Sequence, residues 1–396
     1  MRMYFPPALT NLIVFLATLR FCDAAGRLGV LSTGQVATCL AMFSISYVCS
    51  CLLAGRILHT TNAKPLVLAS IAGLILTAIP SYFNDSFWPI FWLFLAMGIA
   101  VAFFANSIQT FMRGQTTSHA LAPTIANYTL SWSGGCALGT LAGAFLIGRT
   151  QSPLLASLAG PRGLSALTLL IGLAMFLLIA TCRRREFITE SHPVIPDEPH
   201  PLPIDRRWVL IGWCWMFIAN FTQRPLTGFL PKFYAQDGYQ PWVCASLLLV
   251  LLTMQALVGF AGRWMVNWLY RPTALIAIHA GLIATLALLW IFHTHIAALI
   301  PLLLILGSLY GFIYFAAIVY VSNDARSDRN VGINEAVVGL GQTLSLFACD
   351  WIMRLSAHRE AYYPTIITAA IAVLAVALLR LRSPASKPGR VHLATA

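Results

Sequence analysis

Two arginines stand inside long apolar stretches of the chain, where a charged group is costly. Arg20 lies in the apolar run that begins at Phe5, and Arg224 lies in the run that begins at Trp208. If both runs are helices that start at one membrane face, the two guanidinium groups lie ~22 and ~24 Å from that face. Arginine offers a planar fork of donors that suits a carboxylate or a phosphate. Because charge at membrane depth indicates function by default, the pair predicts a binding site for a small anion.

A structural role for the same arginines is the alternative. In an apolar core ~30 Å thick, both residues lie within ~8 Å of the opposite face and could extend their charged groups to it. Asp23, one turn after Arg20, could also neutralise that arginine.

Further polar residues could orient such an anion. Asn220 and Gln223 share a helical face with Arg224. Four polar residues recur at positions i, i+3, i+4 and i+7 of one predicted helix, namely Asn106, Gln109, Thr110 and Arg113. A polar stripe of this kind faces a cavity or a neighbouring helix instead of lipid. Tyr310 and Tyr314, one turn apart, are a further candidate pair, with aromatic packing as the alternative.

Glu335 is the one acidic residue that falls properly inside an apolar run. In a helix over 331–352 it lies ~7 Å from the membrane face at which that helix starts. A carboxyl group buried there could exchange protons. The interpretation we favour is a structural ion pair with Arg326 or Arg329 in the preceding loop, acting as a gate.

The composition requires lipid as the solvent. Apolar residues make up 59% of the 396 residues and charged residues only 10%, against about 25% charged residues in a soluble protein. The basic residues behind the net charge of +12 are dispersed over short loops, which argues against nucleic acid as a partner. The nine cysteines show no paired metal spacing, so we expect neither a metal nor a cofactor. No nucleophile or acid–base pair stands at membrane depth, which argues against an enzyme.

Twelve runs are long and apolar enough for spanning helices: 5–25, 33–55, 64–83, 88–111, 121–148, 163–182, 208–232, 240–262, 271–292, 297–321, 331–352 and 360–381. Polar residues 183–207, rich in proline and charge, read as a linker. The prediction is therefore an all-α integral membrane protein with an N-terminal half over 1–182, a linker over 183–207, a C-terminal half over 208–382 and a tail over 383–396.

The distribution of Lys and Arg predicts the orientation in the membrane. With the amino terminus in the cytoplasm, 17 of the 25 basic residues fall on the cytoplasmic side and 6 on the other. Both termini and the linker are therefore expected in the cytoplasm. Arginine outnumbers lysine and no long extramembrane domain is present, which fits a compact bacterial inner-membrane protein.

A tandem repeat relates the two halves. The segment 55–65 reads GRILHTTNAKP and the segment 262–272 reads GRWMVNWLYRP, so each runs from Gly-Arg to a basic residue followed by proline. The same offset relates Asn127 to Asn334 and Gly134 to Gly341. Because each half has an even number of helices, the repeats insert in parallel.

These features together resemble the major facilitator superfamily of secondary transporters. In the loop between the second and third helices, Gly55, Ile57, Leu58 and Lys64 fit the family motif, while His59 replaces its Asp and Asn62 its second Gly. The fifth helix keeps the glycine ladder of the family's antiporter motif, with Thr140 in place of its Pro and Ala144 in place of its last Gly; the ladder itself is Gly135, Gly139 and Gly143. Phe94 stands where many drug/proton antiporters of the family carry an Arg in the fourth helix.

The resemblance implies two six-helix bundles that rock around a midplane site, lined by the first, fourth, seventh and tenth helices. Arginines on the first and seventh helices are similar to those of the family's organophosphate antiporters. The Asp and Arg that the family links to gating and proton coupling are absent here. Arg56, His59, Arg113 and Glu335 therefore stay as the coupling or gating candidates, with a proton or a counter-substrate as the coupled species.

The sequence thus predicts a monomeric transporter that moves a small organic anion, a carboxylate or a phosphorylated metabolite, through the lipid bilayer by alternating access. Two alternatives stay open. An exporter of hydrophobic compounds is favoured by the aromatic content and the glycine ladder. A non-transporting membrane receptor on the same scaffold is the other.

Overall fold

The structure is a computed structural model, and it describes residues 2–28, 33–59, 61–114, 120–148, 157–158, 160–182, 206–237, 239, 241–323 and 327–382. Most of the predicted linker and the whole predicted tail lie outside these residues. The division of the chain into a linker and two halves at the predicted boundaries therefore stays a prediction.

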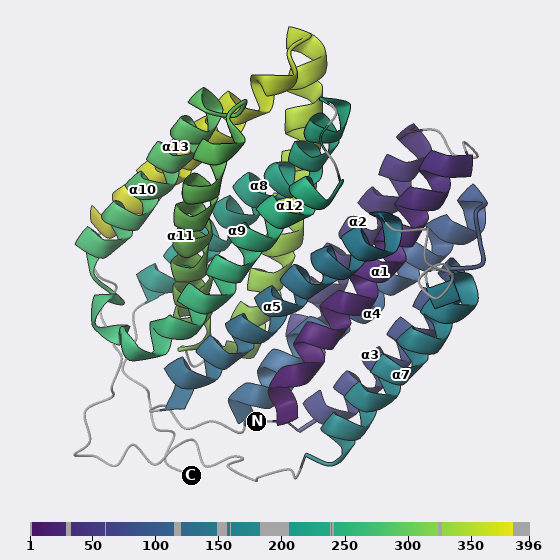
Figure 1. Cartoon of the computed structure of the whole chain (residues 1–396). Coiled ribbons are helices and arrows are strands. Elements are labelled where there is room, and N and C mark those ends of the chain that lie inside the picture. The colour runs from purple at the N-terminus through teal and green to yellow at the C-terminus, as the bar shows by residue number, and fades with distance from the viewer. Residues whose placement is uncertain are drawn as a thin grey trace, which may run out of the picture.

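All long elements within the described residues are helices (Figure 1). Short 3₁₀ turns accompany them: η1 (Arg2–Tyr4), η3 (Gly262–Trp264), η4 (Val266–Trp268) and η5 (Arg359–Ala361). The twelve long helices in the described part of the chain are α1 (Phe5–Leu28), α2 (Thr33–Ile57), α3 (Ala63–Ser81), α4 (Phe87–Gly114), α5 (Leu121–Gly148), α7 (Pro161–Ala180), α8 (Arg206–Gln236), α9 (Pro241–Ala261), α10 (Pro272–Ile291), α11 (Ile296–Ser322), α12 (Ser327–Ser356) and α13 (Tyr362–Arg382). The predicted all-α class and its twelve helices are confirmed.

The helices form where the sequence is apolar, because a backbone in lipid must satisfy its own hydrogen bonds. Nine helices in the described residues are long and apolar enough to cross a membrane. Their outward faces carry exposed large apolar side chains, such as Leu76, Leu170 and Leu379. A protein in water rarely exposes so much apolar surface, and these faces are the ones that meet lipid.

Two helical bundles lie side by side in Figure 1, one built from α1–α5 and α7 and the other from α8–α13. We call them the N-half and the C-half. The two halves contact each other mainly through α2 against α12 and through α5 against α9. We call the end at which α1, α5, α8 and α12 begin, and α2, α4, α9 and α11 end, the closed end.

Glycines let the two halves approach closely at the closed end. A Cβ atom on Gly332 of α12 would lie 2.6 Å from the Cα atom of Gly55, the first residue of the repeated segment. In the second contact, a Cβ atom on Gly259 of α9 would lie 2.5 Å from Cγ2 of Thr129 on α5. A larger residue at position 332 would collide with backbone, and one at position 259 would displace the Thr129 side chain. Small residues therefore permit the close approach of the halves.

Within the N-half, the glycine ladder of α5 packs against α1. A Cβ atom on Gly135 would lie 2.5 Å from the Cα atom of Ala8, and one on Gly139 would lie 2.9 Å from Cβ of Phe15. The side-chain surroundings of Gly143 lie outside the described residues. The ladder thus fixes α1 close to α5, which positions the residues of α1 that face the other half.

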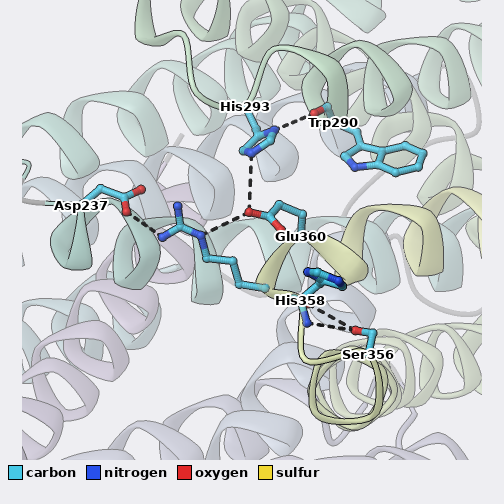
Figure 2. Close-up of polar contacts among 7 residues, drawn as sticks. Asp237, Trp290, His293, Ser356, His358 and Glu360 are labelled. Atoms are coloured by element: carbon cyan, nitrogen blue, oxygen red, sulfur yellow. Dashed lines mark hydrogen bonds and ion pairs between the residues drawn. The ribbon is translucent and has the colours of Figure 1, made fainter.

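A polar cluster at the opposite end joins elements of the C-half only (Figure 2). Arg359 donates from Nη1 to Oδ1 of Asp237 at 2.6 Å and from Nε to Oε1 of Glu360 at 3.3 Å. His293 lies 3.8 Å from the same Glu360 oxygen and contacts the carbonyl of Trp290 at 2.7 Å. The cluster ties the ends of α8 and α10 to the start of α13. Exposed pairs of this kind contribute little stability, and none of these contacts reaches the N-half.

Gly332→Ala is expected to disfavour the closed end, because the added methyl group would collide with the backbone of Gly55. Overpacking of this kind costs about 1–3 kcal/mol, which lowers the ratio of closed to open molecules by roughly 5- to 150-fold. Spin labels at Ile57 and Trp264, which are 43% and 66% exposed on opposite halves at this end, report that ratio by pulsed electron paramagnetic resonance.

Gly134→Ala is the matched control for this experiment. A Cβ atom there meets no heavy atom within 4 Å, so the label distances should equal those of the parent. Identical distance distributions for the parent and Gly332→Ala would contradict the assignment of Gly55 and Gly332 as the contact that limits approach.

Candidate functional site

A cavity of about 570 Å³ lies between the two halves, within the usual range for small-molecule sites. Eight helices line it: α1, α2, α4 and α5 of the N-half and α8, α9, α11 and α12 of the C-half. The wall carries aromatic side chains from both halves, namely Phe15, Phe43, Tyr47, Phe94, Phe104, Tyr128, Trp132 and Tyr314. A mostly apolar wall with a few polar groups suits a small molecule of mixed character.

Charge in the wall is sparse and of both signs. Among the described residues that line the cavity, Arg224 and Glu335 are the only charged ones. Arg224 is half-buried and Glu335 is only 7% exposed. Four amide side chains join them in the wall: Asn11, Asn220, Gln223 and Gln342.

Glu335 binds the opposite half through both carboxylate oxygens. Tyr47 of α2 donates to Oε2 at 2.5 Å, and Gln109 of α4 donates from Nε2 to Oε1 at 2.6 Å. The Gln109 amide group also contacts the Tyr128 hydroxyl at 3.0 Å. A carboxylate from the C-half thus accepts two hydrogen bonds from the N-half beside the cavity.

The predicted ion pair of Glu335 with Arg329 is wrong, whereas the alternative pair with Arg326 stays a prediction. The helix begins at Ser327 instead of residue 331, so Glu335 lies in the third turn and not near the edge. Arg329, six residues earlier, is exposed and points about 120° away around the helix. Arg326 lies outside the described residues. The described partners of the carboxylate are neutral donors.

A second hydrogen-bonded chain crosses between the halves beside the cavity. Tyr314 donates to Oε1 of Gln223 at 2.7 Å, and Gln223 donates from Nε2 to Oε1 of Gln255 at 2.5 Å. Gln255 in turn donates to the Ser133 hydroxyl on α5 at 2.8 Å. Trp132 packs edge-on against Tyr314, with ring centroids 5.0 Å apart. The chain fixes the side chain of Gln223 next to Arg224.

Asn220 is held by its own helix and by α12. Its Nδ2 donates to the Met216 carbonyl at 2.8 Å, and its Oδ1 accepts from Nε2 of Gln342 at 2.9 Å. Sequence reasoning missed Gln342, Gln255, Asn11 and Ser133. The usable signal for Gln255 was a lone amide in an otherwise apolar run, which is costly unless it has a partner.

Other predicted site residues lie behind the wall of the cavity. Asn106 is buried and donates to the Ala102 carbonyl of its own helix at 2.8 Å. The hydroxyl of Tyr310 contacts that of Thr222 at 2.8 Å, also away from the cavity. Gln109 does not line the cavity, but it contacts two residues that do, Glu335 and Tyr128.

The remaining predicted site residues lie at the closed end, or their side chains are not among those that the structure describes. Arg113 donates from Nε to the Ser322 carbonyl at 3.0 Å and so joins α4 to α11. Arg56 and His59 are exposed there, and the His59 backbone N–H donates to Oδ1 of Asn62 at 2.8 Å. Arg20 belongs to α1, but its side chain lies outside the described residues.

Hydrogen bonds between described residues of the N-half and the C-half all lie nearer the closed end than the opposite end of the helices that they join. The pairs involved are Tyr47–Glu335, Gln109–Glu335, Arg113–Ser322, Ser133–Gln255 and Asn127–Arg263. Among the residues described, no three His, Cys, Asp or Glu side chains gather closely enough to hold a metal ion.

Two six-helix bundles that enclose a small-molecule cavity, with the hydrogen bonds between their described residues at one end, are the arrangement of a membrane transport protein. The sequence profile described as Major Facilitator Superfamily matches residues 8–345. The chain therefore belongs to this superfamily, and the predicted family and fold are confirmed. It is a multi-pass membrane protein and a secondary transporter.

Solved structures with the same fold support this assignment. FucP, described as a Major Facilitator Superfamily transporter in the outward conformation, is 13% identical with a TM-score of 0.62, over 96% of this chain and 99% of that one. A variant of the Escherichia coli fucose:proton symporter FucP is 14% identical with a TM-score of 0.63, over 96% of this chain and 97% of that one. The human organic anion transporter MFSD10 (TETRAN) is 14% identical with a TM-score of 0.66, over 95% of this chain and 99% of that one. A comparison with curated protein sequences gave no match.

A double-mutant cycle of Tyr47→Phe and Glu335→Gln is expected to show coupling in the closed-end population, because the two side chains hydrogen-bond across the halves. Measured couplings for such bonds in membrane proteins average about 0.6 and reach about 1.7 kcal/mol. The closed-end spin labels described above supply the populations.

Tyr82→Phe is the control, since its hydroxyl contacts Thr168 at 2.8 Å within the N-half. It also loses a buried tyrosine hydrogen bond, but we expect no coupling to Glu335→Gln. Zero coupling between Tyr47 and Glu335 would show that this bond does not hold the halves together.

Proposed function

We propose that the chain transports a small organic anion, a carboxylate or a phosphorylated metabolite, by alternating access. The observation that carries the proposal is the position of Arg224 in the wall of the central cavity. It is the only cation among the described residues that line the cavity, and its guanidinium group suits carboxylate and phosphate oxygens.

The neighbours of Arg224 support an anion over a cation. The one carboxylate of the described wall, Glu335, already accepts hydrogen bonds from Tyr47 and Gln109. A cationic substrate would have to compete with these two donors. Gln223 and Asn220 are held in fixed positions one residue and one turn before Arg224, so they orient an anion bound there. Arg20, from the equivalent helix of the N-half, is our proposed second anchor.

The orientation follows from the positive-inside rule. The closed end carries basic residues of both halves, among them Arg56, Arg113, Arg263 and Arg271, so we place it in the cytoplasm of a bacterial cell, with both termini. The cavity then receives substrate from outside. Glu335 and Arg113, and the exposed Arg56 and His59, are our candidates for gating and for coupling to a proton or a counter-substrate.

The fold likeness alone does not select a substrate. The similar structures include a fucose:proton symporter and an organic anion transporter, so one scaffold serves a sugar and organic anions. The aromatic wall favours export of hydrophobic compounds as the second candidate. If the protein exports hydrophobic compounds, the rate of transport should not fall when Arg224 is replaced. A receptor would bind ligand without flux.

Arg224→Gln is expected to lower uptake of anionic substrates at least ~30-fold, because loss of one partner of a buried charge pair costs about 2–5 kcal/mol. Arg224→Lys should give an intermediate value, since lysine keeps the charge but not the fork. Uptake is measured in proteoliposomes with a panel of small carboxylates and sugar phosphates, each paired with a neutral analogue.

Arg271→Gln is the control, because Arg271 is exposed and does not line the cavity. It should retain parental uptake. The anion proposal is wrong if the neutral analogues are the preferred cargo, or if Arg224→Gln and Arg271→Gln transport anions equally well.

A further inference from the structure

The two halves supply different chemistry to the wall of the central cavity. Seven of the eight aromatic residues in the described wall belong to the N-half, and Tyr314 is the exception. The C-half supplies both charged residues of that wall, Arg224 and Glu335, and three of its four amide side chains. An anion bound to Arg224 therefore meets an aromatic surface across the cavity, on the other half.

Some of the aromatic side chains of the N-half keep part of their surface accessible. Phe15 of α1 and Trp132 of α5 line the cavity and are half-buried, whereas Phe94 and Phe104 are only 1% and 3% exposed. Phe94 packs edge-on against Phe43, with ring centroids 6.5 Å apart. Phe94 is thus covered by its neighbours, while the rings of Phe15 and Trp132 can be touched by a molecule in the cavity.

Contacts through α5 place Phe15 near Arg224. A Cβ atom on Gly139 of α5 would lie 2.9 Å from Cβ and 3.0 Å from Cγ of Phe15, so this phenylalanine packs directly against that turn of α5. Cys136, three residues before Gly139, lines the cavity and interacts electrostatically with Arg224. A single turn of α5 therefore contacts Phe15 of its own half and faces Arg224 of the other half.

Trp132 approaches Arg224 from the next turn of α5. Its ring packs edge-on against Tyr314, with centroids 5.0 Å apart, and the Tyr314 hydroxyl donates to Gln223, the residue before Arg224. Trp132 also lies one turn before Cys136, which interacts with Arg224. Two separate contacts, one through Tyr314 and one through Cys136, therefore bring the indole ring into the neighbourhood of the guanidinium group.

We infer that the transported anion carries an aromatic ring, which packs against Phe15 and Trp132 while its anionic group binds Arg224. The inference rests on the proposed function and narrows its substrate class. Aromatic rings attract one another in edge-on and offset geometries through their quadrupoles, in addition to the gain from apolar burial. The cavity therefore discriminates an aromatic acid from a saturated acid of similar size.

Equilibrium binding to the purified full chain tests the inference with matched acids. The probes are benzoate against cyclohexanecarboxylate, phenylacetate against cyclohexylacetate, and phenylpropionate against cyclohexylpropionate, with benzamide as the uncharged aromatic probe. The three pairs differ in the distance between the ring and the carboxylate. At least one aromatic acid should bind about two- to tenfold tighter than its saturated partner, which is the gain expected from contact between rings.

Trp132→Leu and Phe15→Leu should each reduce this preference and together remove it, because leucine keeps an apolar side chain but has no ring. Trp132→Phe keeps a ring and should keep the preference, which also controls for folding. Trp92→Leu is the matched control, because Trp92 of α4 is 59% exposed and does not line the cavity; its preference should equal the parent's. A merely structural role for Trp132 would weaken both acids of a pair equally and leave their ratio unchanged.

Equal affinities within every pair, tighter binding of the saturated acids, or a preference that the double variant retains would overturn the inference. If the acids then still bind in a way that Arg224→Gln abolishes, the proposed transport of anions stands and only the requirement for a ring fails. If no acid binds, or if benzamide binds as tightly as benzoate and Arg224→Gln has no effect, both fail.

Discussion

A buried carboxylate of the C-half takes its described hydrogen bonds from the N-half, and this contact links the two halves. Glu335 accepts from Tyr47 and Gln109, and burial of such a group without partners is strongly destabilising. Separation of the halves at the closed end would remove both donors at once. The carboxyl group must then meet water, a proton or new partners. Because Glu335 also lines the cavity, the contact that holds the halves together can respond to what the cavity contains.

Close approach of the helices makes this contact possible. Gly332 of α12 lies against Gly55 of α2, where a Cβ atom on Gly332 would collide with the backbone and one on Gly55 would be tight at 3.1 Å. Lipid provides no hydrophobic force between helices, so tight packing and interhelical hydrogen bonds must hold the halves. All of the hydrogen bonds between the halves in the described structure fall in the closed-end half of the helices. If the two halves rock about the cavity so that the closed end opens, these are the hydrogen bonds between the halves that break.

The fold could be predicted from the sequence because lipid restricts the choice to helices of known length. The site was only partly predictable. Arg224 stood out as a charge in an apolar run, and its neighbour Gln223 followed from helical spacing. The contact between Tyr47 and Glu335 joins distant parts of the chain, and helical periodicity contains no information about which helices meet. The helix that carries Glu335 was predicted to begin at residue 331 but begins at Ser327. Glu335 therefore lies deeper in the helix than expected, in the wall of the cavity.

A structure of the protein determined with a saturating concentration of a transported carboxylate tests the central claim most directly. The claim is that the cavity between the halves holds an organic anion by its carboxylate. We expect ligand density between the halves, with carboxylate oxygens about 2.7–2.9 Å from the Arg224 guanidinium nitrogens. Density at another place, or a ligand in the cavity whose carboxylate points away from Arg224, would contradict the claim.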